Sequence, residues 1–410
     1  MEQAVDRGPA ARRSRRLAGF DGLRGLAALG VLVLHATDVA LIAHPGAHDF
    51  TAQLQSGVQI FFVLSAFLLA RPFVRAVLTR RPLPGVRAYA RSRLLRIIPA
   101  YWVALVGSTV FLGTTDMHSA KDWLVQLTLT QVYSIGQFAR GISVAWTLSV
   151  EVTFYLLLPF FFMAVAACTK RLSPIAALAS GTAVLFVGGA GFMLWTASGN
   201  RFLPSLWLPF YLPVFALGIA LAIVREAVVD PRRRQAAGTF ACRTAVLWWA
   251  AAAAVLAFAA IRYGRLVLIP YRAHLLGSQV AYGVYALLLV VPLVLDFEGV
   301  SVVTRLLERR VVVFLGLVSY PLYLWHNQIT TAVREHWLHL GNAPGNALEQ
   351  LAIVLAVTLV VASVSWFALE RPIIEYGRRL GSRRRIAASA VERPPEAAAT
   401  AAGFRHDAAS

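Results

Sequence analysis

The sequence is poor in charged residues and in cysteine, and each scarcity excludes a class of protein. Charged side chains make up 14% of the 410 residues, whereas 58% are hydrophobic and the mean hydropathy is +0.64. This composition excludes a large water-soluble enzyme and predicts a polytopic membrane protein. The two cysteines, Cys168 and Cys242, fall in stretches that we place near the cytosol, so we expect no structural disulfide.

The hydrophobic runs predict an all-α, polytopic transmembrane helical bundle. Most runs are about 20 residues long and lack the period-two alternation of an outer-membrane β-barrel strand. We detect no internal repeat, and we expect no soluble domain long enough to carry catalysis. The ten predicted spans are 20–42, 57–72, 97–113, 143–167, 174–197, 205–224, 244–261, 276–296, 311–333 and 348–369.

The net charge of +19 could indicate a nucleic-acid partner, but its distribution indicates membrane topology. We counted lysines and arginines in the segments before, between and after the spans. The first segment and every second one after it carry 31 in total, and the segments between them carry seven; Arg71 is counted in the segment that follows its span, and Arg24 lies inside the first span. Because such residues concentrate in cytoplasmic loops, we predict a multi-pass cell-membrane protein with both termini in the cytoplasm. We therefore expect the lipid bilayer as a partner, and we expect no nucleic-acid partner.

Three regions follow from this topology. They are a basic cytosolic N-terminal segment (1–19), a membrane domain (20–372) and a cytosolic tail (373–410) that is first basic and then disordered. Segment 116–137 is predicted to lie outside as an interfacial or re-entrant helix. An eleventh span there would invert every later segment and destroy the charge alternation.

Arg24 and His35 are ionisable residues inside the first predicted span, where such groups tend to mark function. Eleven helical residues bring the chain back to nearly the same face, with about 16 Å between the two along the axis. Glu151, in the fourth span, is expected at a depth similar to that of His35. A carboxylate beside an imidazole suits a general base, although a packing hydrogen bond or a transporter's proton relay would also use this pair.

Arg93 and Arg96 are three residues apart, so one helix face can present both guanidinium groups to the same anion. Arginine binds phosphate bidentately, which suits a cytosolic ligand that carries a nucleotide. The alternative is a cluster that sets topology and touches lipid headgroups.

A further polar patch comprises Tyr320, Tyr323 and His326 in the ninth span. Their spacing places them roughly on one helix face, either as an interfacial aromatic belt or as the lining of a pocket. His35 and His326 also raise the possibility of bis-histidine haem ligation, which we set aside because we expect the two at different depths. None of these residues requires a metal.

Six motifs in order resemble the acyltransferase-3 family of integral membrane O-acyltransferases, over about residues 20–372. They are Asp21-Gly22-Leu23-Arg24-Gly25 with His35, Gly57-Val58-Gln59-Ile60-Phe61-Phe62-Val63-Leu64-Ser65, Arg93-x-x-Arg96, Trp146-Thr147-Leu148-Ser149-Val150-Glu151, Ser319-Tyr320-Pro321-Leu322-Tyr323-Leu324-Trp325-His326 and Glu370-Arg371-Pro372. Two positions depart from the family pattern: Ala66 replaces a glycine, and Val152 replaces a second acidic residue.

The resemblance implies transfer of an acyl group, usually acetyl, from acyl-coenzyme A to a hydroxyl. It implies a catalytic role for His35, which Glu151 would orient, and a donor site at Arg93 and Arg96, to which we add Arg24. We place Ser65, Tyr320, Tyr323 and His326 in the substrate pocket. Acyl-coenzyme A is a donor substrate, and no permanently bound cofactor is expected.

The acceptor and the chemical route stay open at the level of sequence. We expect an extracytoplasmic carbohydrate or glycolipid; a cytosolic small molecule, such as a macrolide or a glycosylated antibiotic, is the alternative. Either His35 acts as a base or it attacks the thioester itself and forms an acyl-imidazole. A transporter or flippase is the rival from another class, but it gives the arginine pair no evident role.

Overall fold

The computed structural model describes residues 9–41, 44–263, 271–297, 301–340, 346–377 and 379, and these residues contain helices and no strand. This confirms the predicted all-α bundle. Residues 9–19, which we predicted as a separate basic segment, are part of the first helix. Residues 1–8 and the predicted disordered tail beyond Arg385 lie outside the described residues.

Nine helices among the described residues are long and apolar enough to cross a membrane. The helices that form these crossings are α1 (Pro9–Thr37), α3 (Gly57–Leu78), α4 (Val86–Gly107), α7 (Trp146–Cys168), α8 (Pro174–Ser198), α9 (Leu208–Ala227), α10 (Pro231–Tyr263), α11 (Tyr271–Leu295) and α15 (Ala347–Ser365). Each corresponds to one predicted span. Two boundaries matter for the site, because α1 ends at Thr37 rather than at 42, and α4 begins eleven residues before the predicted 97.

The remaining predicted span, 311–333, is broken into two short helices, α13 (Arg310–Leu317) and α14 (Ser319–Ala332), and a π-helical turn at Val333–Trp337. Pro321 has no N–H to bond with the carbonyl of Leu317, and its ring crowds that carbonyl. The hydroxyl of Ser319 also donates to the carbonyl of Gly316 (2.8 Å). Both effects interrupt the helix at Val318, between α13 and α14.

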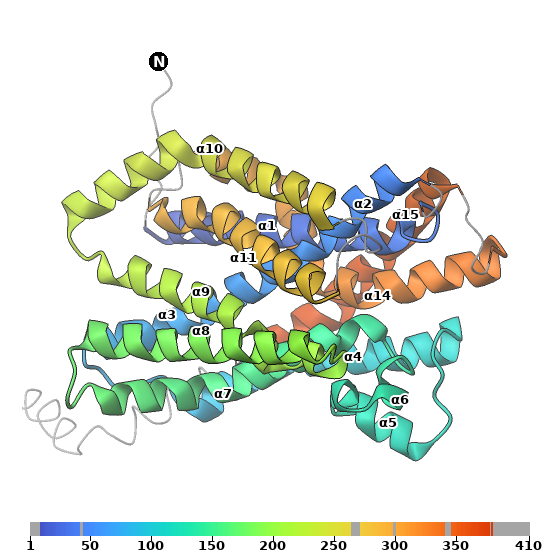
Figure 1. Ribbon diagram of the computed structural model, residues 1–410, viewed down its shortest axis with the longest axis horizontal. Helices are drawn as coiled ribbons and strands as arrows, with labels where there is room; N and C mark the ends of the chain where they lie inside the picture. The colour runs from blue at the N-terminus through green and yellow to red at the C-terminus, as the bar shows by residue number, and fades with distance from the viewer. Residues whose placement is uncertain are drawn as a thin grey trace, which may run out of the picture.

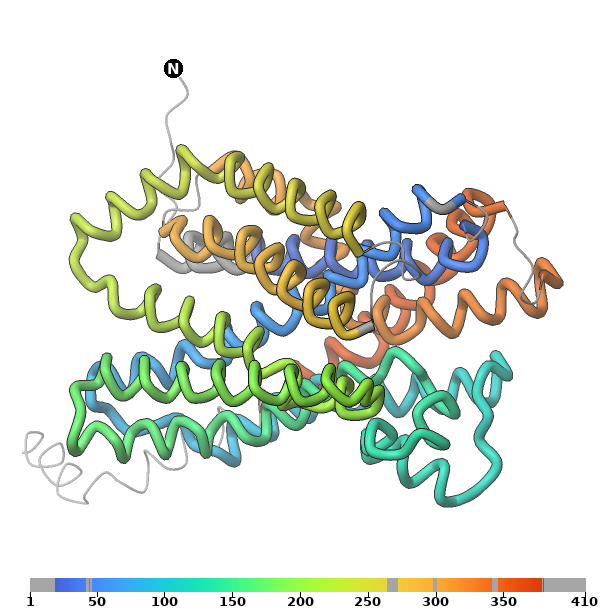
Figure 2. The backbone as a smooth tube through the Cα atoms, viewed as in Figure 1, coloured from blue at the N-terminus to red at the C-terminus, as the bar shows by residue number. Residues whose placement is uncertain are grey.

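The turns of the bundle gather at two opposite ends (Figures 1 and 2). The turns between α7 and α8 and between α9 and α10 lie at one end, on the left of both views. The short helices α2 (Pro45–Ala52), α5 (Ala120–Leu127) and α6 (Ile135–Phe138) lie at the other end. A last short helix, α12 (Val302–Leu307), precedes α13. The two ends correspond to the two sets of segments that the charge count separated.

Segment 116–137 contains no helix long enough to span, in agreement with our reading of it as a non-spanning segment. Its centre is the buried carboxylate of Asp122, which accepts hydrogen bonds from Gln137 (2.8 Å) and Arg140 (3.1 Å) and from the backbone N–H of Ser119 (2.8 Å). The hydrogen bonds from Gln137 and Ser119 hold the pKa of Asp122 below its usual range. A charged carboxylate therefore ties this segment together.

Helix α1 lies against α13 with backbone touching backbone. A Cβ built on Gly25 would stand 2.6 Å from the amide nitrogen of Gly316, and one on Gly316 would overlap the carbonyl of Asp21. Glycine is needed at these two positions because any side chain would force the helices apart. The close approach fixes the part of α1 that carries Arg24 beside the helix that leads into α14.

Aromatic rings join α3, α7 and α9 in the apolar core. The ring of Phe215 stacks on Phe154 (4.0 Å between centroids) and on Phe62 (4.9 Å), and Phe73 stacks on Phe162 (5.1 Å). Stacked aromatic pairs bury a large apolar area in defined geometry. They give rigid walls to the polar site that these helices enclose.

Candidate active site

Two cavities among α1, α3, α4, α7 and α14 share three lining residues, namely Arg24, Glu151 and Tyr320. One encloses about 400 Å³ and reaches Tyr323; the other encloses about 520 Å³ and reaches Arg93 and Arg96. Most of the residues predicted for the site therefore line two adjacent cavities. This arrangement favours a pocket over an aromatic belt for the two tyrosines.

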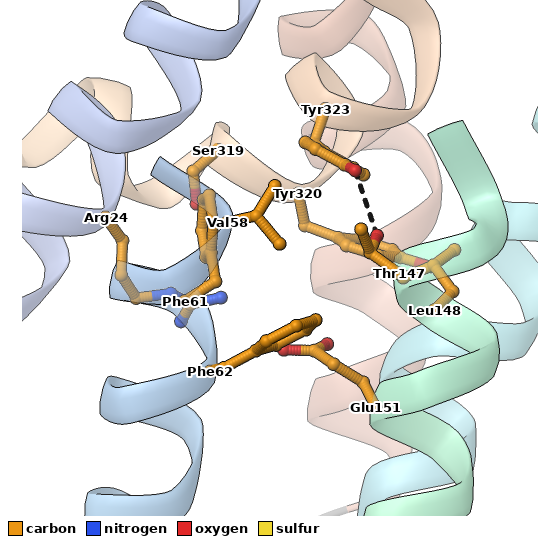
Figure 3. A pocket seen from close by; sticks show the side chains of 10 residues that line it. All are labelled: Arg24, Val58, Phe61, Phe62, Thr147, Leu148, Glu151, Ser319, Tyr320 and Tyr323. Carbon is orange, nitrogen blue, oxygen red and sulfur yellow. Dashed lines mark hydrogen bonds between the residues drawn. The ribbon is translucent and has the colours of Figure 1, made fainter. Parts of the chain in front are cut away.

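Arg24 and Glu151 point toward one another across the first cavity (Figure 3). The guanidinium of Arg24 lies 5.9 Å from the ring centroid of Phe61, close enough for a cation–π attraction. Phe61 was not singled out in the sequence, although it lies within one of the quoted motifs. The aromatic face and the carboxylate together hold the arginine side chain inside the pocket.

Glu151 belongs to a hydrogen-bond chain of three side chains. Tyr155 donates to Ser65 (3.1 Å), and Ser65 donates to a carboxylate oxygen of Glu151 (2.9 Å). Ser65 lies on α3, whereas the other two lie one turn apart on α7. The i, i+4 spacing of Glu151 and Tyr155 was the sequence signal for this cluster, which our sequence reading did not use.

Arg93 and Arg96 line the second cavity from α4, in the same ring of residues as Glu151 and Tyr155. Both lie on the helix, more than a turn beyond its start at Val86. Tyr320 donates to the carbonyl of Ile97 (2.7 Å) and so fastens α14 beside the arginine pair. The cavity thus presents three arginines and one carboxylate to whatever enters it.

His35 lies near the end of α1 and contacts His326 of α14. Nδ1 of His35 is 2.9 Å from the carbonyl oxygen of Val31 and 3.2 Å from Nε2 of His326. The two rings are 5.0 Å apart. The different depths that we expected for the histidines are therefore wrong, since α14 starts afresh at Ser319 and the end of α1 comes sooner than predicted.

Among the described residues, no hydrogen bond joins His35 to Glu151. The carboxylate bonds to Ser65 and faces Arg24, and His326 is the side chain that contacts the imidazole. Our estimate of a shared depth came from counting residues along two helices, which leaves the rotation of each helix undetermined. The expected direct contact between Glu151 and His35 is thus replaced by a contact between two histidines.

The histidine pair does not have the geometry of bis-histidine haem ligation. Two axial metal–nitrogen bonds of about 2 Å, on opposite sides of the iron, place the nitrogens about 4 Å apart, whereas these nitrogens are 3.2 Å apart. Tyr323 packs beside the pair, with its ring 5.5 Å from that of His326. Its hydroxyl accepts from Thr147 (2.9 Å) and donates to the carbonyl of Val144 (3.0 Å). Tyr323 therefore stands between the cavity and the histidines.

The long apolar helices and the family of the chain together identify it as an integral-membrane acyltransferase. It belongs to the acyltransferase-3 family, whose model, described as an acyltransferase domain, matches residues 17–369. The family confirms the resemblance found in the motifs and makes the chain an acyltransferase enzyme. With its apolar helices, it also makes the chain a multi-pass membrane protein.

Three relatives illustrate the match. "Nodulation protein 10" of Rhizobium leguminosarum bv. viciae is 24% identical over 396 residues, which cover 89% of this chain and 95% of the relative. "Putative peptidoglycan O-acetyltransferase YrhL" of Bacillus subtilis (strain 168) is 25% identical over 90% of this chain and 57% of its own length. "Putative O-acetyltransferase SACOL0978" of Staphylococcus aureus (strain COL) is 21% identical over 89% of this chain and 58% of its own. The chain thus spans under three fifths of the last two. No solved structure matches it significantly.

Proposed function

We propose that this enzyme moves an acetyl group from acyl-coenzyme A to a hydroxyl of an extracytoplasmic carbohydrate or glycolipid. Two of the relatives, which are named as putative O-acetyltransferases, support acetyl as the group transferred. The observation that carries the proposal is the pair of adjacent cavities, one lined by Arg93 and Arg96 and the other by Tyr323, whose ring packs beside His326. A glycan acceptor is supported by the relative whose name gives peptidoglycan as its substrate.

Each end of this pair of cavities suits one substrate. Phosphate groups of the donor would bind Arg93 and Arg96 with help from Arg24, since guanidinium groups hold phosphate oxygens bidentately. Arg24 and His35 are eleven residues apart on α1, about 16 Å along the axis. The extended pantetheine arm of coenzyme A is the part that would cover this distance and bring the thioester toward His35.

In the transfer step, His35 takes the proton of the acceptor hydroxyl as its oxygen attacks the thioester carbonyl. The carbon–sulfur bond breaks, the new ester forms, and the departing thiolate receives the proton from His35. Tyr323 and Thr147 border the space where these groups would meet. The topology that this requires places the arginines toward the cytoplasm, with both chain termini on that side.

The test is release of coenzyme A by purified protein in nanodiscs, with acetyl-coenzyme A and a panel of glycan, glycolipid and macrolide acceptors. His35→Ala should abolish release and leave donor binding intact. Activity on the macrolide alone would favour the cytosolic alternative. Wild-type release by His35→Ala would contradict the proposed role of the histidine.

Direct attack by His35 is distinguished in the same preparation. An acyl-imidazole intermediate gives ping-pong kinetics and exchanges labelled coenzyme A into acetyl-coenzyme A without any acceptor. Proton abstraction by His35 requires the acceptor, so no exchange should occur in its absence.

A further inference from the structure

His326 is a fully buried histidine whose role is set by its hydrogen bonds. Its Nδ1 lies 2.8 Å from the carbonyl oxygen of Tyr323 and 3.2 Å from that of Leu322. A carbonyl oxygen can only accept, so Nδ1 of His326 carries a proton. In the neutral ring the other nitrogen, Nε2, is then an acceptor, and that nitrogen faces His35.

The same reasoning fixes the proton on His35. Its Nδ1 lies between two acceptors, the carbonyl oxygen of Val31 at 2.9 Å and Nε2 of His326 at 3.2 Å. Nδ1–H can donate to both in a bifurcated hydrogen bond, whereas an unprotonated Nδ1 would face two lone pairs. The proton therefore resides on Nδ1, and the lone pair of neutral His35 resides on Nε2.

We propose that His326 is a positioning residue that holds His35 in the Nδ1–H tautomer and leaves Nε2 of His35 as the reacting atom. The inference rests on the proposed acyl transfer, and it gives His326 the orienting task that the sequence assigned to Glu151. The exposed fraction of His326 is 0%, so water does not compete for its Nε2. His35 itself is half-buried. A hydrogen bond to the carbonyl of Val31 alone would keep the proton on Nδ1 but would leave the imidazole ring of His35 free to turn away.

The tautomer is directly measurable. In neutral protein labelled with ¹⁵N-histidine, the two ring nitrogens of His35 give different resonances, which His35→Gln identifies among the nine histidines of the chain. We expect a protonated Nδ1 and an unprotonated Nε2 in the wild type, and a mixture of tautomers in His326→Phe. A protonated Nε2 in the wild type would overturn the proposal without affecting the case for acyl transfer, which His35→Ala tests.

Turnover provides the second readout. His326→Phe keeps a ring of similar size and should lower kcat by about 10- to 100-fold with an unchanged donor KM. His326→Gln can place an oxygen near the position of Nε2 and should recover part of kcat. His48→Gln, at a histidine that bonds to Asp38 outside the cavities, is the matched control and should have normal kcat. Normal kcat in His326→Phe, or equal losses in the Phe and Gln variants, would refute the positioning role.

Discussion

Single residues divide the site into a part lined by charged side chains and a pair of histidines. Glu151 shares the cavity with Arg24 and accepts the hydrogen bond of Ser65, while His35 and His326 contact each other nearer the end of α1. The carboxylate is thus placed to hold arginine and serine side chains.

Glu151→Gln should therefore weaken catalysis without unfolding the protein. The amide keeps an oxygen for Ser65 but loses the attraction for Arg24, and a charged hydrogen bond is worth about 1.5–3 kcal/mol, or roughly 10- to 150-fold in kcat/KM. Steady-state kinetics of Glu151→Gln, Ser65→Ala and the double variant test this, because residues joined by one hydrogen bond give non-additive effects. Fully additive losses would show that the two act separately.

Arg93→Ala and Arg96→Ala should each raise the apparent Kd for acetyl-coenzyme A. The binding free energy should weaken by about 1.5–3 kcal/mol per lost charged hydrogen bond. Lysine at either position should rescue only part of the binding, because it lacks the planar fork. Isothermal titration in nanodiscs measures both. Arg87→Ala, an exposed arginine on the same helix, is the control. If all three alanine variants bound the donor equally well, the pair would serve topology alone.

Whole helices hold these residues in register through close backbone contacts. Gly25 and Gly316 let α1 and α13 touch, and α14 begins directly after that contact. Because α1 carries both Arg24 and His35, the geometry of the site depends on this close contact with α13.

Gly316→Ala should separate α1 from α13 and destabilise the fold by about 1–3 kcal/mol, since the new methyl group meets the carbonyl of Asp21. Thermal unfolding followed by tryptophan fluorescence measures the loss, and donor affinity should fall because Arg24 moves. Gly188→Ala, in α8 with no heavy atom within 4 Å of the added Cβ, is the control and should be neutral or slightly stabilising. Equal melting temperatures for the two variants would contradict the close packing.

The segment around Asp122 should loosen in acid. The folded protein holds the pKa of Asp122 below its unfolded value of about 3.9. The carboxylate therefore contributes its full stabilisation above about pH 4 and loses it as the pH falls toward the folded-state pKa. Hydrogen exchange in residues 114–142 should be slower in the wild type than in Asp122→Asn at pH 6, with the difference shrinking below about pH 4. Asp116→Asn, at an exposed carboxylate, should show no such difference.

The elements were largely predictable from the sequence, but their contacts were not. Nine spans stand out because runs of apolar residues this long have few other uses. The break at Val318 could not be predicted in this way. Pro321 lies within an apolar run, and hydropathy alone treats that run as one continuous span. The pairing of His35 with His326 joins residues 291 apart, and it depends on the tilt and rotation of two helices, which neither spacing nor hydropathy specifies.

The molecule as a whole has two ends of different charge. The segments that the sequence assigns to the cytoplasm hold 31 of the 39 lysines and arginines, and the turns of the bundle fall at two opposite ends (Figure 1). The predicted orientation turns the arginine pair on α4 toward the cytoplasm.

Reporter fusions test this orientation. Fusions after residues near 48, 130 and 340 should report an extracytoplasmic location, and those near 85, 235 and 385 a cytoplasmic one, because positively charged loops stay inside. A cytoplasmic signal at 130 would overturn the orientation, and with it the extracytoplasmic acceptor.

The crowding of Arg24, Arg93 and Arg96 around one carboxylate has a thermodynamic consequence. Like charges in a confined space repel, so the empty pocket opposes the folded state, and a bound polyanion relieves that opposition. By mass action, a ligand present at 100 times its Kd stabilises the protein by about 2.7 kcal/mol. The melting temperature should then rise with the concentration of the donor. Such an enzyme would be least durable when its cell is short of acyl-coenzyme A, and its abundance would follow the supply of its own substrate.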